Sequence, residues 1–124
     1  MTIAEAIKTA QEIYPSAAAY PTETLVQWLD SVDHTWFNEV VMLHVNEDGL
    51  DYKGYTAEDQ DTVLLIPEPY DEAYIFFIMA KADLYNGELD RYNNSAILYS
   101  EAYKRAADAW NRTHKHLGPR RFIW

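Results

Sequence analysis

The sequence has no cysteine among its 124 residues, which excludes disulfide bonds and thiolate zinc sites. It has only four glycines, and neither a glycine-rich phosphate loop nor a dinucleotide-binding fingerprint occurs. No apolar run approaches the ~18 residues that a membrane-spanning helix needs, and the first residues show no basic stretch leading into an apolar one. We therefore expect a protein without a membrane anchor or a cofactor, which stays in the compartment where it is made.

Basic residues are scarce over most of the chain and crowded at its end. Residues 1–103 carry four Lys and Arg against nineteen Asp and Glu, a net charge of −15, whereas residues 104–124 carry six against one, a net charge of +5. A basic end of this kind is typical of a segment that meets nucleic acid, a membrane surface or an acidic protein. A second copy of this chain is itself such an acidic protein. The competing interpretation is a basic end with no function.

The chain has enough apolar material for one core. Its hydrophobic fraction of 48% over 124 residues is sufficient for a helical domain that needs neither a metal nor cross-links. Apolar residues recur mostly at the three- and four-residue spacing of helices. We predict a mainly α fold, in which residues 1–124 form a single domain. This domain is a bundle of about four helices, with a small β-hairpin or a loop inserted between the second and the third.

The first two helices have recognisable starts. Thr2 and Glu5 have the spacing of a capping box, which predicts a helix over residues 1–14, directly before a proline. Thr22 is the predicted N-cap of a second helix over residues 22–44. One apolar stripe at helical spacing runs along this second helix: Leu25, Leu29, Val32, Trp36, Val40 and Leu43.

The insertion covers residues 45–66. It opens with the turn-forming residues 46–49 and continues as a polar, acidic stretch. Residues 63–66 are β-favouring, and Leu50 and Tyr52 alternate as residues of a short strand do. The segment is therefore predicted to be either a loop or a small hairpin that projects from the helices.

The last two helices are predicted to pack against each other. Residues 70–86 are mostly apolar on every side, which is typical of a buried central helix. Residues 88–115 form a long fourth helix, with a later start at Asn94 or Ser95 as the alternative, because both are good cap residues. Residues 117–124 are predicted to form an extended tail that is both basic and aromatic.

No arrangement of residues in the sequence predicts catalysis. His34 and His44 are nearly three helical turns apart, and His114 and His116 stand beside positive charge, so the histidines make no metal-binding pattern. The acidic stretch 46–51 lacks the ligand spacing of an EF-hand. We predict no enzyme activity and no metal site. One alternative is an enzyme that uses the acidic loop and His44 on a bound metal.

Aromatic residues are unusually frequent, with ten tyrosines and four tryptophans. Five are predicted to pack between the last two helices: Tyr74, Phe77, Tyr99, Tyr103 and Trp110. Some of the others should be exposed, since a small domain has little interior: Tyr14, Tyr20, Trp28, Phe37, Tyr52, Tyr55, Phe122 and Trp124. Exposed aromatic and arginine side chains are concentrated at protein interfaces, which predicts self-association. The candidate interaction residues are Tyr52, Tyr55, Arg112, Lys115, Arg120, Arg121, Phe122 and Trp124.

Several segments carry a resemblance to a known family. They are Pro67-Glu68-Pro69-Tyr70-Asp71-Glu72-Ala73-Tyr74, Asp83-Leu84-Tyr85-Asn86-Gly87-Glu88, Arg91-Tyr92-Asn93-Asn94-Ser95, and Tyr103 followed by Trp110-Asn111-Arg112-Thr113-His114. With these segments the chain resembles the head-tail connector proteins, also called adaptor or head-completion proteins, of tailed phages and prophages of Gram-positive hosts. The resemblance rests on residue types and spacing and includes no catalytic motif.

The resemblance implies a structural protein of the virion neck. Such a protein joins copies of itself in a dodecameric ring beneath the phage portal protein, extends the DNA channel, and docks the tail or the next neck protein. DNA is then only passing cargo, no membrane is involved, and assembly takes place in the host cytoplasm. The alternative is an acidic regulatory or inhibitor protein that acts by binding a protein or by mimicking DNA.

Overall fold

The computed structural model describes residues 1–117, which form a helical domain. Its α-helices are α1 (Ile3–Ile13), α2 (Thr22–Glu39), α3 (Glu72–Tyr85) and α4 (Leu89–Thr113), and two short 3-10 helices, η1 (Pro15–Ala19) and η2 (Val41–Leu43), follow α1 and α2. These residues include isolated β-bridges but no strand. The predicted mainly α fold with about four helices is confirmed.

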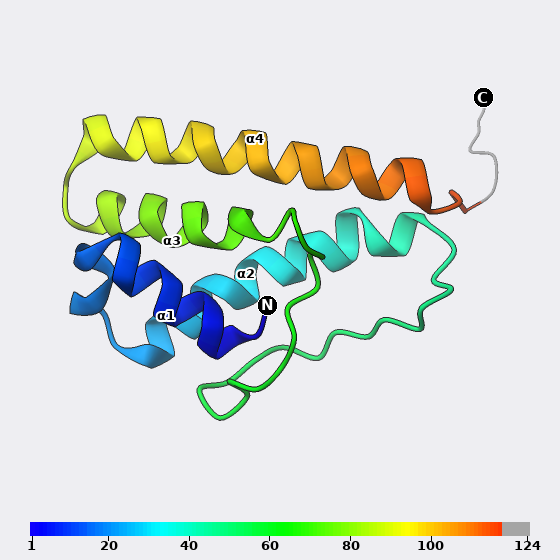
Figure 1. Cartoon of the computed structure of the whole chain (residues 1–124), viewed down its shortest axis with the longest axis horizontal. Coiled ribbons are helices and arrows are strands. Elements are labelled where there is room, and N and C mark those ends of the chain that lie inside the picture. The colour runs from blue at the N-terminus through cyan, green and yellow to red at the C-terminus, as the bar shows by residue number, and fades with distance from the viewer. Residues whose placement is uncertain (118–124) are drawn as a thin grey trace.

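The four helices lie in two layers. Figure 1 shows α4, the longest helix, lying along α3, with α1 and α2 on the other side of α3. The helix-free chain between η2 and α3 passes beneath α1 and α2 before it rises to the start of α3. The turn between α3 and α4 lies at one end of the molecule, and the C-terminal end of α4 lies at the other.

Helix α1 begins as predicted. Glu5 donates its backbone N–H to Thr2 Oγ1 at 3.1 Å, and Thr2 donates its own N–H to Glu5 Oε1 at 2.8 Å, which completes the capping box. The helix ends at Ile13, and Pro15 then opens η1, because the fixed φ of proline suits a first helical position.

Helix α2 differs from the prediction at both ends. Pro21, in an extended conformation, is its N-cap, and Thr22 is its first helical residue, so the predicted capping role of Thr22 is wrong. The α-helix stops at Glu39 instead of continuing to residue 44. Val40 and Val41 are both buried at the point where the chain leaves the helix, and burial of these two poor helix formers outweighs the continued helical spacing.

Helices α3 and α4 form one continuous unit. Helix α3 starts at Glu72 and is buried along most of its length, and Gly87, with φ of +75°, reverses the chain after it. Helix α4 begins at Leu89, which excludes the later start at Asn94 or Ser95. Ser95 is buried, and its hydroxyl donates to Asp83 Oδ2 at 2.7 Å, so it ties α4 to α3 instead of capping a helix.

The aromatic core joins three helices. Phe77 of α3 meets Tyr99 of α4 at 4.9 Å between ring centroids, as predicted for that pair of helices. Tyr103 and Trp110 of α4 instead pack edge-on against Trp36 of α2, at 5.5 and 5.7 Å. Trp36 is fully buried, so the long fourth helix covers α2 as well as α3.

The predicted β-hairpin is absent from residues 45–66, where the chain is a loop. Its strand-like part pairs with the start of the chain: Leu64 donates its N–H to the Met1 carbonyl at 2.9 Å, and Ile3 donates to the Thr62 carbonyl at 3.0 Å. The hydrogen-bonding groups of residues 62–64 are therefore used by the N-terminal end of α1, which leaves no ladder for a hairpin with residues 50–55.

Candidate functional site

Some of eight aromatic residues were predicted to be exposed, and none of those that the structure describes is fully exposed. Six of those eight residues lie in the part of the chain that the structure describes, and Trp28 among them is buried while the other five are half-buried. Trp28 packs between Tyr20 at 5.0 Å and Tyr85 at 5.8 Å. Among the Phe, Trp and Tyr residues of 1–117, Tyr85 is the exposed one, with 63% of its surface accessible. The interior accommodates more aromatic side chains than the length of the chain suggests.

Tyr52 and Tyr55, two of the predicted interaction residues, are bonded to helix α2. The Tyr52 hydroxyl donates to a carboxylate oxygen of Asp30. Tyr55 donates its N–H to the same oxygen at 3.0 Å and its hydroxyl to Asp33 Oδ2 at 2.5 Å. Burial, and next the neighbouring carboxylates, raise the pKa of both tyrosines. These contacts hold the loop onto α2, so the two side chains have a structural role within the subunit.

Asp33 is the centre of the largest buried polar cluster. It is fully buried and accepts hydrogen bonds from Tyr55, from Tyr74 Oη at 2.5 Å and from the Leu65 N–H at 3.0 Å. Tyr74 Oη in turn accepts from the Ile66 N–H at 2.7 Å. Burial raises the pKa of Asp33, while the donated hydrogen bonds oppose that shift.

Asp83 is a second buried carboxylate with its own donors. It accepts from the Tyr14 hydroxyl and, at 2.7 Å, from Ser95, which links the end of α1 to α3 and α4. The carboxylate oxygens of Asp33 and Asp83 all receive donated hydrogen bonds, and both groups lie in the packed interior. Their geometry suits holding helices together, because no reacting group has access to the oxygens.

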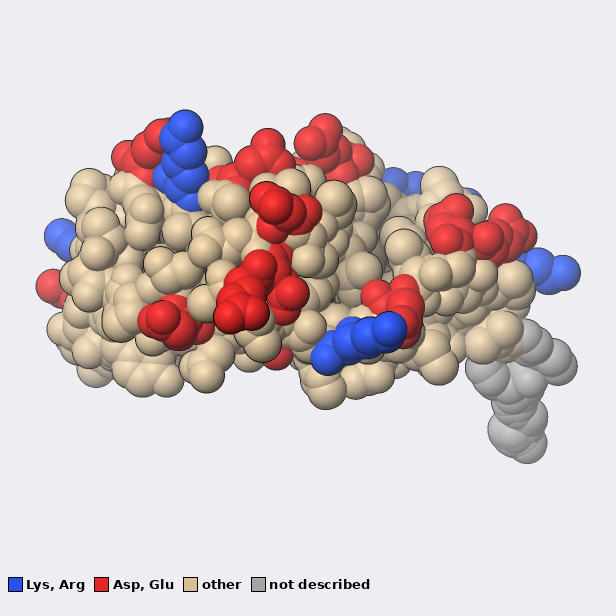
Figure 2. Space-filling model, turned by 90° about the horizontal axis from the view of Figure 1, so that it is seen from below, with Lys and Arg blue, Asp and Glu red and all other residues tan. Residues whose placement is uncertain are grey.

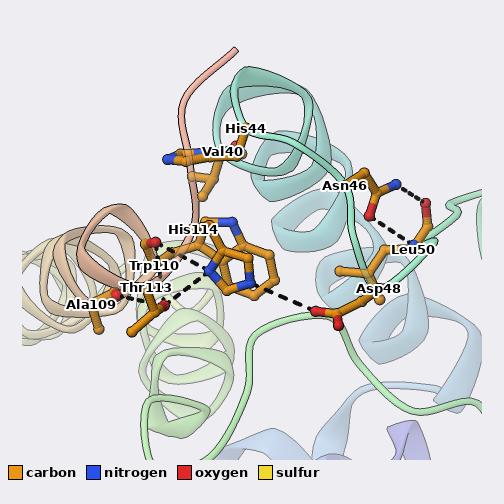
Figure 3. A network of polar contacts seen from close by, with 9 residues as sticks. All are labelled: Val40, His44, Asn46, Asp48, Leu50, Ala109, Trp110, Thr113 and His114. Atoms are coloured by element: carbon orange, nitrogen blue, oxygen red, sulfur yellow. Dashed lines mark hydrogen bonds and ion pairs between the residues drawn. The ribbon is translucent and has the colours of Figure 1, made fainter.

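Three of the four histidines, His44, His114 and His116, gather where α2 and α4 end, as Figure 3 shows for His44 and His114, whereas His34 lies within α2 beside Tyr52. His44 is 2% exposed, and its Nδ1 lies 2.6 Å from the Val40 carbonyl, while its buried Nε2 has no hydrogen-bond partner among residues 1–117. The rings of His44 and His116 are 4.3 Å apart. His114 stacks on Trp110 at 3.7 Å, and its Nε2 lies 3.6 Å from Asp48 Oδ2.

This cluster does not form the metal site of the alternative interpretation. Over residues 1–117, no three His, Asp or Glu side chains are placed so that they could hold one metal ion. The acid in the cluster, Asp48, faces His114 and not His44. Asn46 uses both its amide oxygen and its amide nitrogen on the backbone of Leu50, at 2.9 and 2.7 Å, so the acidic loop forms a closed turn (Figure 3).

The cluster does fix the end of α4. The Val45 N–H donates to the Lys115 carbonyl at 2.7 Å, and the Leu117 N–H donates to the Leu43 carbonyl at 3.0 Å. We call these two hydrogen bonds the terminal clasp. They set the position from which the basic tail leaves the domain.

The remaining predicted interaction residues fall into two groups, one inside and one outside the described part of the chain. Arg112 and Lys115 lie beside the terminal clasp, are exposed, and form no ion pair within residues 1–117. The other four predicted interaction residues, Arg120, Arg121, Phe122 and Trp124, lie outside the described residues.

Exposed aliphatic side chains are a feature that the sequence analysis missed. Some gather at the turn between α3 and α4, some on the outer side of α4, and one at the end of α1. They include Leu84, Leu89, Ile97, Leu98 and Ile13. Those on α4 lie on a different side of the helix from Tyr92, Ala96 and Tyr99. A helical projection of residues 89–113 would therefore have predicted that they are exposed.

Acidic side chains gather on the opposite side of the molecule from α4. Figure 2 shows red acidic groups across the middle of the face that looks downward in Figure 1, with few blue basic ones among them. The loop before α3 contributes Glu58, Asp59 and Asp61, of which Glu58 and Asp61 are exposed. This face therefore repels polyanions and attracts basic segments.

Comparison with known proteins gives no relative: no protein-family model, curated protein or solved structure matches this chain. Among residues 1–117, no helix combines the length and the apolar character needed to cross a membrane.

Proposed function

We propose that this protein is a structural subunit of the neck of a tailed phage, where copies of it form a ring between the portal protein and the tail. The observation that carries the proposal is the polarity of the helical body. Arg112 and Lys115 are exposed at one end of the molecule and form no ion pair with the described part of the chain, while acidic groups and aliphatic side chains occupy other faces. A ring needs such a contact, in which one surface meets a different surface of the next copy.

Two further observations support assembly. The carboxylates and tyrosines of the buried clusters are used in holding the helices together, which leaves the outer surfaces as the part of the molecule able to act on a partner. Residues 67–114 resemble head-tail connectors, and such proteins are small helical subunits that assemble by binding further copies of themselves. An acidic surface lining the channel would also keep DNA from binding as it passes.

Native mass spectrometry tests the proposal on the purified full-length chain, over a range of concentrations, with and without the portal protein of the same genome. We expect a closed oligomer, or one that forms on the portal. A strict monomer that ignores the portal contradicts the proposal, and capture of a host nucleic-acid enzyme by that monomer supports the acidic inhibitor instead. The order of genes gives an independent check, since portal and capsid genes should lie upstream and tail genes downstream.

A further inference from the structure

A largely apolar groove lies between α1 and α3. It has a volume of about 380 Å³ and is lined by Met1, Thr9, Ile13, Asp71, Glu72, Ile75, Phe76 and Met79. Ile13 is 61% exposed on its wall, whereas Phe76 and Met79 are partly buried and form its floor. We call this hollow the α1–α3 groove. Met and Phe side chains at the floor adapt readily to an inserted aromatic ring.

The charged side chains that line the groove are both acidic, and the amino group of Met1 is the positive group beside them. Asp71 and Glu72 line it, and no Lys or Arg does. Asp71 lies 3.8 Å from the amino group of Met1, and Glu72 lies 2.7 Å from an Arg105 nitrogen at a half-exposed position. Both residues line the groove, and a carboxylate with one partner can still accept further hydrogen bonds, up to about four in all. The groove therefore combines an apolar floor with an acidic side.

The basic tail has the complementary pattern. Residues 120–124 read Arg-Arg-Phe-Ile-Trp, two cations followed by three large apolar residues. Arginine and tryptophan are the residues that contribute most strongly to protein interfaces, arginine through paired hydrogen bonds to carboxylates and tryptophan through buried area. We propose that residues 120–124 of one copy dock in the α1–α3 groove of the next copy. The inference rests on the proposed self-assembly and names the contact that produces it.

Distance favours a second copy over the same chain. Arg105 pairs with Glu72, and α4 continues eight residues beyond it, about 12 Å further from the groove. The groove lies between α1 and α3, and Figure 1 shows α1 on the side of α3 away from α4, so a tail of the same chain would have to run back along α4 and then around α3 to enter the groove. The terminal clasp holds Leu117 at that end, and a fully extended chain from there to Phe122 covers only about 17 Å.

A labelled peptide of residues 117–124 tests the contact directly by fluorescence anisotropy. The receiver is the full-length chain carrying Arg120→Glu and Arg121→Glu, which has an intact groove and a tail that does not compete. Adding Ile13→Arg to the receiver should weaken peptide binding about thirtyfold, the effect of losing one strong interface contact. Adding Ile97→Arg is the matched control, since Ile97 is 57% exposed on α4 and lies outside the groove. It should leave peptide binding unchanged.

Mixing two defective chains separates docking between copies from docking within one. The tail variant keeps its groove and the Ile13→Arg variant keeps its tail, so each alone should remain monomeric while their mixture forms pairs and no larger species. Peptide binding that is the same in the Ile13→Arg and Ile97→Arg receivers, or absent from both, overturns the inference. A monomeric wild-type chain that binds the peptide much more weakly than the tail variant overturns it too, because its own tail then fills the groove. If the wild type and both variants form rings equally well, the groove contact is overturned and the proposed function still stands.

Discussion

Tyr74 and Asp33 form the buried link on which the helix-free loop depends. Tyr74 Oη donates to Asp33 Oδ1 at 2.5 Å and at the same time accepts the Ile66 N–H at 2.7 Å. A side chain of α3 thus holds a carboxylate of α2 and the backbone of the loop before α3. Because both residues are fully buried, water cannot replace either contact.

Replacing Tyr74 with Phe should lower the free energy of unfolding by about 2–4 kcal/mol, since it leaves the Ile66 N–H and one Asp33 oxygen buried without partners. Urea denaturation followed by circular dichroism measures the change. Tyr85→Phe is the control, because its hydroxyl belongs to an exposed side chain, and it should change stability by less than about 0.5 kcal/mol. Equal stabilities of the two variants would contradict the assigned role of Tyr74.

Asp33→Asn should alter how stability depends on pH. Burial raises the pKa of Asp33 in the folded protein above the ordinary value of about 3.9. The folded state therefore binds this proton more tightly, and the resulting stabilisation is complete below about pH 3.9 and lost as the pH rises through the raised pKa. The asparagine variant has no titrating carboxyl group at position 33, so its stability lacks this pH-dependent contribution. The stability of the wild type minus that of the variant should thus fall with rising pH over that interval.

Urea titrations of both proteins at a series of pH values measure the difference, and the shared background of surface carboxylates cancels in it. A difference that rises with pH, or that does not depend on it, would contradict a raised pKa for Asp33.

Alkaline titration should divide the ten tyrosines into groups. Burial and the nearby charge of Glu39 raise the pKa of Tyr99 to about 12, and burial also raises the pKa of Tyr103. Their neutral forms contribute stability that is complete below about pH 10 and is lost as the pH rises above it. Ultraviolet absorbance should show late ionisation that coincides with the loss of the circular dichroism signal. Ionisation of all tyrosines near pH 10 in a folded protein would exclude these shifts.

Trp110→Ala tests whether the Trp36–Trp110 contact belongs to the core. Trp110 is 7% exposed and packs edge-on against Trp36, so its removal should cost about 3–5 kcal/mol of stability. Thermal or urea unfolding measures the loss. A variant of wild-type stability that fails to oligomerise would place Trp110 in an interface between subunits instead.

Local signals in this sequence predicted local structure well. The capping box of Thr2 and Glu5 needs only residues three apart, and it forms as expected. The apolar α3 is buried, as its composition indicates. The turn of residues 46–49 likewise follows from side-chain chemistry within the segment.

Long-range partners account for the errors. Asp33 falls off the apolar stripe of α2, yet it is buried because its donors come from Leu65 and Tyr74, 32 and 41 residues later. Residues 63–66 favour a strand, but they pair with the first residues of the chain and not with their neighbours. Helical spacing carries no information about either pairing. Surface hollows lined by side chains from distant segments, such as the α1–α3 groove, cannot be predicted from the sequence for the same reason.

The terminal clasp forms only when the domain is completely folded, so the point at which the tail begins is fixed only in the folded protein. Leu43 and Leu117 are joined only when the ends of two helices, separated by most of the chain, have come together. Such distant closures form late, because the entropy of a long loop must be overcome first. A partly folded subunit thus offers neither a fixed starting point for its tail nor a formed groove. In the proposed ring, such a subunit would therefore be excluded without any separate proofreading step.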